Sequence, residues 1–191
     1  MTESAAVRIY EPMAPDGVEW VLMDRDDGQN RLLDIGTQPV KKSWTPLPVH
    51  LLASDERTGR PLVRSQLPWL GRHVLVLRDE AIDALGPMLE PFGELLPLSC
   101  SNATLMLVHM TNVVDALDET ESEIVRFPSS ERVMKIAIHS FKANVVRRGQ
   151  AFKLPQMPRG SIYLTDDLVH AIGAFGFEGT GFRLVGEASV G

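Results

Sequence analysis

The sequence predicts an α+β fold with a mostly antiparallel sheet and few short helices. Short apolar runs recur along the 191-residue chain, and Gly, Pro, Asn and Asp turn signals separate them. Consecutive runs follow one another closely, which favours hairpins. The chain lacks the long helical periods that alternate with strands in a doubly wound parallel sheet.

The N-terminal part begins with two expected strands, at 7–10 and 18–23, on either side of a turn signal. A polar, acidic loop is expected at 24–30. Prolines then exclude a long helix from residues 36–68, and Trp44 and Trp69 should pack onto the core. We expect an irregular covering layer there, because this segment has too many large apolar residues for disorder.

One strand–helix–strand unit occurs twice, around 74–98 and around 161–185. In each copy a buried strand leads into a short helix, and a further strand follows. The two copies align at a constant offset of 87 positions, which matches Leu77 with Leu164, Asp79 with Asp166, Ala84 with Ala171 and Gly86 with Gly173.

The ends of the two expected helices carry residue types that favour their positions. Thr165 is a suitable N-cap for the second helix, and Asp79 can cap the first. Gly86 and Gly173 can each end a helix by adopting a positive φ. The repeat therefore predicts two equivalent elements, whether it arose by duplication or by convergence.

Strand-like runs also lie between the two copies. One is expected at 103–110, and two more at 123–127 and 132–138 should form a hairpin around Pro128-Ser129-Ser130. Residues 152–155 are expected to be extended.

Composition favours a single domain, 1–191, that folds without a metal or a disulfide. The one cysteine, Cys100, excludes an intramolecular disulfide and indicates a reducing compartment. The first residues lack a signal-peptide pattern and no run is long enough to span a membrane, so we expect a cytoplasmic location and no membrane partner. A net charge of −6 argues against nucleic-acid binding. Oligomeric state is left open.

No motif predicts catalysis, a metal site or a cofactor. The five histidines form no HExxH pattern or other ligand spacing, and no Gly-x-Ser-x-Gly elbow is present. We expect Cys100 to be a buried structural residue. The glycines of 176–181 have the reverse of the dinucleotide-binding spacing and follow a helix, so we interpret them as a turn.

An acidic stretch follows the string Asn112-Val113-Val114-Asp115-Ala116-Leu117-Asp118. If residues 113–118 form a helical turn, Asp115 and Asp118 share a face. Either Asn112 or Asp115 could also cap such a turn, which would make these residues structural. A solvated acidic loop and a binding surface both remain open. The stretch comprises Asp115, Asp118, Glu119, Glu121 and Glu123.

The chain resembles a family of bacterial immunity proteins from polymorphic toxin systems, formerly a domain of unknown function, that is named after a myxobacterial member. Three segments carry the resemblance, which extends from Val7 to Val185 and is strongest after Val74. They are Thr111 to Asp118 with Ser122, Phe152-Lys153-Leu154-Pro155 leading into Ile162 to Asp166, and Gly181-Phe182-Arg183-Leu184 after the last helix.

The resemblance implies a non-enzymatic protein that binds and neutralises a cognate toxin, which an adjacent gene would encode. Many such toxins have basic clefts for nucleic acid, and an acidic surface would imitate the phosphate backbone. The acidic stretch therefore supplies the candidate toxin contacts Asp115, Asp118, Glu119, Glu121 and Glu123. Two alternatives remain: an enzyme with a His and Asp site that no motif reveals, and an accessory domain that binds a ligand.

Overall fold

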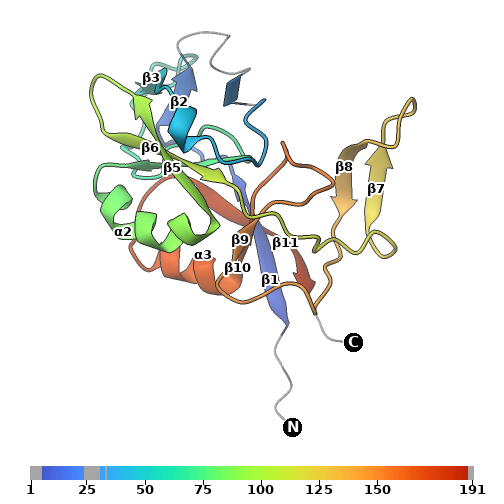
Figure 1. Ribbon diagram of the computed structural model, residues 1–191. Helices are drawn as coiled ribbons and strands as arrows, with labels where there is room; N and C mark the ends of the chain where they lie inside the picture. The colour runs from blue at the N-terminus through green and yellow to red at the C-terminus, as the bar shows by residue number, and fades with distance from the viewer. Residues whose placement is uncertain (1–5, 24–30, 33, 189–191) are drawn as a thin grey trace.

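The computed structural model describes residues 6–23, 31–32 and 34–188, so the acidic loop expected at 24–30 lies outside the described residues. The described chain forms two sheets, a separate two-stranded hairpin and short helices (Figure 1). Nearly all strand pairs are antiparallel, and β3 with β5 is parallel. The predicted α+β fold with few short helices is confirmed.

The first sheet has five strands in the order β2-β3-β5-β6-β4. Its strands alternate in burial or are buried on both faces, as expected for a sheet covered by helices and loops. Their bounds are β2 Trp20–Met23, β3 Leu47–Leu52, β4 Leu75–Arg78, β5 Gly93–Ser99 and β6 Leu105–Met110.

The second sheet has four strands in the order β11-β1-β10-β9. The N-terminal and C-terminal strands are neighbours in it, so the two ends of the chain meet in one sheet (Figure 1). The bounds are β1 Val7–Met13, β9 Ala151–Phe152, β10 Tyr163–Thr165 and β11 Gly181–Ala188.

The repeated unit is a split β-α-β arrangement in both copies. In the first, α2 (Glu80–Leu89) and the 3₁₀ turn η2 (Glu90–Phe92) connect β4 to β5, and β6 pairs antiparallel with both strands. In the second, α3 (Asp166–Gly173) connects β10 to β11, and β1 pairs antiparallel with both. Each copy thus has a central antiparallel strand inserted between two parallel strands.

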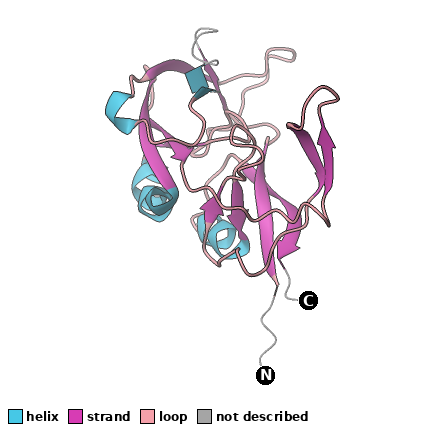
Figure 2. Cartoon of the chain, turned by 45° about the vertical axis from the view of Figure 1, so that its right-hand side comes forward, coloured by secondary structure: helices cyan, strands magenta, loops and turns pink. Residues whose placement is uncertain are grey.

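The two copies share one hydrophobic core. Figure 2 shows α2 and α3 nearly end-on and side by side, and Figure 1 places them next to each other. Burying equivalent apolar faces against each other removes both from water, which explains why the pattern is conserved between the copies. The core contains four pairs of residues related by the offset of 87: Leu75 and Ile162, Leu77 and Leu164, Ala81 and Leu168, and Leu85 and Ile172.

The helix ends differ from the sequence prediction in detail. Asp79 and Thr165 do occupy the N-cap positions, but neither side chain makes the capping hydrogen bond. The Oδ1 of Asp79 accepts a hydrogen bond from the backbone N–H of Thr104 (3.0 Å), and Thr165 Oγ1 accepts one from Gln150 (2.9 Å). Gly86 lies inside α2 and does not end it, because the helix continues to Leu89.

Residues 36–68 cover the first sheet and also contribute to it. The prolines exclude an α-helix as predicted, and η1 (Lys41–Ser43) is a single 3₁₀ turn. The segment nevertheless contains β3, which pairs with β2 and β5. Trp44 packs against the core of this sheet and donates its indole N–H to Pro97 O (2.8 Å).

Candidate functional site

The string Asn112 to Asp118 is extended, so the helical turn considered from its spacing is wrong. It forms isolated bridges, Val113 with Lys153 and Leu117 with Phe141. The Asn112 side-chain amide donates to Ala151 O (2.7 Å) and caps no helix. Ala116 and Leu117 are fully buried in a third hydrophobic core, together with Phe141 and Phe152. The motif therefore ties β6 to β9 and to the segment after the hairpin.

Three of the five acidic candidates hold their own surroundings together. The Asp115 carboxylate pairs with Lys142 (2.9 Å), and the pKa of Asp115 is lowered mainly by that bond. Asp118 accepts hydrogen bonds from the backbone and hydroxyl of Thr120 (3.0 and 2.7 Å), which lowers the pKa of Asp118. Each residue thus has a local structural role.

Glu119 joins the acidic stretch from Asp115 to Glu123, here called the acidic connection, to the hairpin. Its carboxylate pairs with Arg126 on β7 (Glu123–Arg126; 2.7 Å), and it also accepts a hydrogen bond from the Gln156 amide (2.9 Å). Glu121 and Glu123 are exposed, and Glu123 begins β7. Of the five candidates, these two have the side chains that contribute least to the local structure.

A hairpin projects from the body of the molecule beside the acidic connection (Figures 1 and 2). It comprises β7 (Glu123–Arg126) and β8 (Val133–Ile138), as the sequence predicted. Ile124 and Ile136 anchor it on the third core. The hairpin exposes three large apolar side chains in the twelve positions from 127 to 138: Phe127 (41%), Met134 (43%) and Ile138 (59%).

The register of this hairpin slips twice. Each slip leaves one residue of β8, Met134 or Ala137, without a partner on β7, which is the arrangement of a β-bulge. Bulges redirect side chains and bend a strand away from regular pairing. Both bulged residues lie against a cleft at the base of the hairpin.

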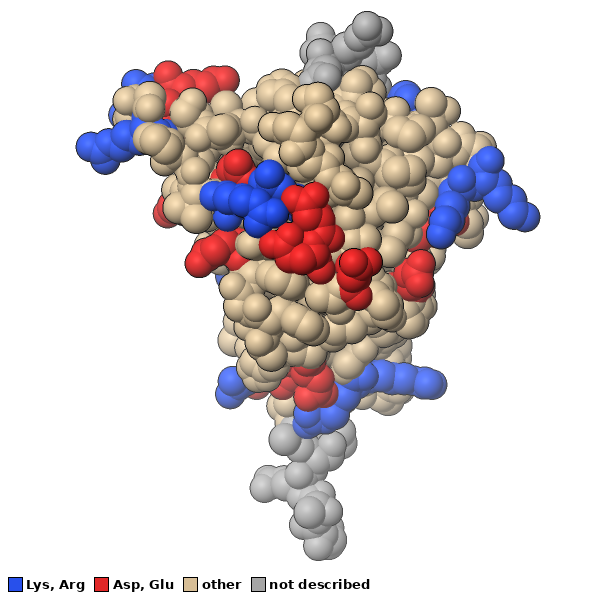
Figure 3. Space-filling model, turned by 90° about the vertical axis from the view of Figure 1, so that its left-hand side faces the viewer, with Lys and Arg blue, Asp and Glu red and all other residues tan. Residues whose placement is uncertain are grey.

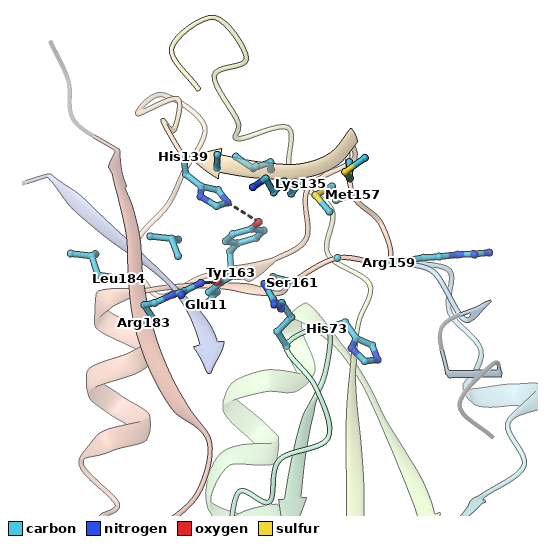
Figure 4. A pocket seen from close by; sticks show the side chains of 16 residues that line it. Glu11, His73, Lys135, His139, Met157, Arg159, Ser161, Tyr163, Arg183 and Leu184 are labelled. Atoms are coloured by element: carbon cyan, nitrogen blue, oxygen red, sulfur yellow. Dashed lines mark hydrogen bonds and ion pairs between the residues drawn. The ribbon is translucent and has the colours of Figure 1, made fainter. Parts of the chain in front are cut away.

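This cleft has a volume of about 710 Å³ and lies between β8, β10, β11 and the loop at 157–161. Figure 4 shows His139 and Tyr163 pointing toward each other across it, with Lys135 and Met157 on one side and Glu11 and Arg183 on the other. Its residues come from five separate parts of the chain. Only the tertiary structure brings them together.

The polar groups of the cleft form two pairs. His139 Nε2 lies 3.1 Å from the Tyr163 hydroxyl, and Arg183 forms an ion pair with the buried carboxylate of Glu11. Burial lowers the pKa of His139, which favours its neutral imidazole, and burial also raises the pKa of Tyr163. No hydrogen bond joins His139 to a carboxylate among the described residues.

A buried lysine supports the wall of the cleft. Lys153 has 3% of its surface exposed, and its ammonium group donates to Pro158 O (3.2 Å) in the 157–161 loop. Burial lowers the pKa of Lys153 to about 8. Burial, together with the charge of Lys153, lowers the pKa of His73 to about 4. His73 lines the cleft, and its Nε2 is buried without a hydrogen-bond partner among the described residues.

The remaining histidines and Cys100 are scattered. His109 is buried in β6 with Nε2 2.9 Å from Gln38 O, whereas His50 and His170 are exposed on β3 and α3. In the described ranges no group of three or more His, Cys, Asp or Glu residues is arranged to hold a metal ion. Cys100 is partly buried rather than buried, and its thiol donates to Asn102 Oδ1 (3.1 Å).

The glycine-rich turn at 176–181 has a packing role. Gly179 has φ +132°, and a Cβ there would lie 2.2 Å from Ser65 Oγ. The turn also pairs with Leu67 through a bridge and through Thr180. The prediction of a turn is confirmed, because the chain here links α3 to β11 and lies against the segment around Leu67.

On the face opposite the hairpin, the described residues show no large patch of one charge (Figure 3). Figure 3 shows Lys and Arg in small groups next to Asp and Glu, with uncharged residues between them. The distinctive surface features lie on the hairpin side: an acidic connection, exposed apolar residues and a cleft with several cations.

Sequence reasoning identified the acidic connection and the hairpin but missed the cleft. Arg72, Lys135 and Arg183 are far apart in the sequence, and no spacing links them. Tyr163 lay within a segment that carried the family resemblance, although nothing local marked its contact with His139. A projecting arm with apolar and charged groups has the composition of a protein-binding surface.

Comparison with known families agrees with the interpretation as a protein that binds another protein. Residues 100–187 match an immunity protein family (Imm11), which confirms the resemblance to an immunity protein family over somewhat less than half of the chain. The match contains the acidic connection, the hairpin and most of the cleft. A search of curated proteins finds no match. No helix in the part of the chain that the structure describes is long and apolar enough to cross a membrane.

Proposed function

We propose that this protein is an immunity protein that binds a cognate bacterial toxin and neutralises it without catalysing a reaction. The family match over residues 100–187 is the observation that carries this proposal. The toxin would be encoded by an adjacent gene, and the two proteins would meet in the cytoplasm. A toxin that damages its own producer explains why such an inhibitor is needed there.

We place the toxin contact on the hairpin and the acidic connection beside it. Exposed apolar side chains next to charged groups favour a protein interface, because the apolar groups supply burial and the charges supply register and rate. Phe127, Met134 and Ile138 provide the apolar part. The acidic part comprises Asp115, Asp118, Glu119, Glu121 and Glu123, which would face a basic surface of the toxin.

The first test is co-expression with the adjacent toxin-like gene, scored by growth and by co-purification of a complex. The proposal expects full rescue and a stable complex. The double variant Phe127→Ala/Ile138→Ala should weaken the complex by about 1–4 kcal/mol without unfolding the protein, because both side chains are largely exposed. Val63→Ala, an exposed apolar residue outside the hairpin, is the matched control and should bind normally.

The acidic contribution is best tested at Glu121 and Glu123, since Asp115, Asp118 and Glu119 also hold the local structure. Glu121→Gln/Glu123→Gln should slow association and reduce its dependence on salt. Asp83→Asn, an exposed acid on α2, serves as the control. Unchanged association kinetics and salt dependence in the double variant would remove the acidic surface from the proposal. Failure of the wild-type protein to rescue growth with its toxin would refute the proposal as a whole.

A further inference from the structure

The cleft at the base of the hairpin contains more hydrogen-bond donors than acceptors. It is lined by four cationic residues and one acid, although the chain as a whole is acidic. Arg183 is paired with Glu11, and Arg159 is paired with Asp34 (3.0 Å). The lining therefore departs from the overall charge of the protein.

Two cations of the cleft have no internal counter-charge. Arg72 and Lys135 are exposed, and neither forms an ion pair within the described ranges. They come from different elements, the turn before β4 and the bulged strand β8. Two cations that line one cleft and have no carboxylate partner of their own would gain from an anionic group placed between them.

Neutral donors line the same cleft. Ser161 is 7% exposed, and its hydroxyl has no hydrogen-bond partner among the described residues. The Tyr163 hydroxyl is shared with His139. The Glu11 carboxylate is already engaged by Arg183, so it does not fill the space. Cations and hydroxyl groups that can donate, beside a carboxylate that is already paired, are groups that bind a further carboxylate.

Apolar side chains border the cleft on both sides. Met134 and Leu184 are exposed by 43% and 47%, and both line it. Met134 belongs also to the exposed apolar group of the hairpin, so the cleft is continuous with the proposed toxin contact. A small soluble anion would leave these apolar side chains exposed, whereas a peptide segment would bury them.

We infer that this cleft binds an acidic segment of the cognate toxin, with carboxylates placed between Arg72 and Lys135 and donors supplied by the cleft wall. The inference rests on the proposed function and extends it to a second, oppositely charged contact. The interface then presents acidic groups on the β7 side of the hairpin and basic groups on the β8 side. Alternating charge fixes the orientation of the partner, because a misplaced partner meets like charge.

Lys153 holds the 157–161 loop, which forms one wall of the cleft. Its ammonium group donates to Pro158 O and fixes the loop that carries Gly160 and Ser161. A loop held by such a contact has less backbone freedom to lose on association than an unattached loop.

The test compares charge reversal in the cleft with charge reversal elsewhere. Affinity for the catalytically inactive toxin is measured by calorimetry at two salt concentrations. At about 50 mM salt the surface charges are weakly screened, and at about 300 mM salt they are strongly screened. Arg72→Glu/Lys135→Glu should bind about 10- to 100-fold more weakly and should lose part of the salt dependence. Lys41→Glu/Lys42→Glu, in η1, makes the same change in charge away from the cleft and should bind normally.

Charge-conserving and neutral variants complete the design. Arg72→Lys/Lys135→Arg should stay within about fivefold of the wild type, and Arg72→Gln/Lys135→Gln should fall between the wild type and the reversal. Thermal unfolding of each variant checks the fold. Equal affinity and salt dependence in the reversed and wild-type proteins would overturn the inference while leaving toxin binding intact. A wild-type protein that does not bind the toxin would instead refute the proposed function.

A second measurement separates a toxin segment from a free anion. Inorganic phosphate is titrated into the protein alone and followed by NMR at His139 and Tyr163. The inference expects no saturable binding at phosphate concentrations that are low compared with cellular levels. Saturable binding that Arg72→Glu/Lys135→Glu abolishes, with toxin affinity unchanged, would show a site for small anions and would overturn the inference.

Discussion

The two strand–helix–strand units have the same local pattern but are completed in different ways. The first unit, β4-α2-β5, receives its central strand from β6, which follows it directly in the chain. The second unit, β10-α3-β11, receives its central strand from β1 at the other end of the chain. One unit is therefore local in sequence, and the other forms only when the two ends of the chain meet.

This difference shows what a repeated sequence pattern specifies. The pattern specifies a strand, a helix and a strand with apolar faces. It does not determine which further strand pairs between the two strands of the unit. Pairing Ile9 with Thr165 closes a much longer loop than pairing Leu77 with Met106. Long-range pairing costs more loop entropy and slows folding. The shared core between α2 and α3 then makes each unit depend on the other.

Truncating equivalent core residues should have the largest effect. Leu77→Ala and Leu164→Ala each remove a fully buried side chain from the shared core, and each should lower the free energy of unfolding by about 2–5 kcal/mol. Urea unfolding is followed by tryptophan fluorescence and by far-UV circular dichroism. Because the three tryptophans all lie in the N-terminal part, coincident curves for Leu164→Ala indicate that the units unfold together. Separate transitions by the two probes would contradict the shared core.

The residue that precedes each unit should cause a smaller difference between the units, which appears in the pH dependence of the free energy of unfolding. His73 precedes β4, and its counterpart 87 positions later is Gly160. The pKa of His73 is lowered to about 4 in the folded state, so the unfolded protein takes up the proton first as the pH falls. Its contribution to stability is present above about pH 6.5 and is lost between about pH 6.5 and 4.

A variant without this titration should resist acid better. His73→Phe should lose about 1–3 kcal/mol less stability than the wild type when the pH falls from about 7 to about 4.5. The measurement is the midpoint of urea unfolding at each pH, and His170→Phe, on an exposed helix position, is the control. Parallel pH curves for His73→Phe and the wild type would show that His73 is not buried in its neutral form.

The smallest effect is expected at a pair of equivalent glycines. Gly173 is the last residue of α3 with open space around it, whereas a Cβ on Gly86 would lie 3.0 Å from Leu95 Cδ1. Gly173→Ala should raise stability by about 0.4–1 kcal/mol because it restricts the unfolded chain. Gly86→Ala should gain less, since Leu95 must move. Thermal unfolding decides the order, and a larger gain at Gly86 would show that α2 and β5 pack less tightly than α3 and its surroundings.

The proposed binding surface was only partly predictable for a related reason. The acidic residues from Asp115 to Glu123 are continuous in sequence, so composition alone revealed them. Their division into structural and exposed members depends on partners such as Lys142, Arg126 and Gln156, which tertiary contacts supply. The cleft was not predictable at all, because its residues are gathered from five distant segments.

The sequence by itself determined the elements of this protein. Apolar alternation, turn residues and the offset of 87 specify most of the described strands, the helices α2 and α3, and the hairpin, because these depend on neighbouring residues. The tertiary structure decided the rest. It placed β1 between β10 and β11 and β6 between β4 and β5. It also kept the Asn112 string extended and placed the cations of the cleft beside exposed apolar groups. Those outcomes depend on which distant surfaces bury each other and leave the fewest polar groups unsatisfied, and no local pattern records that.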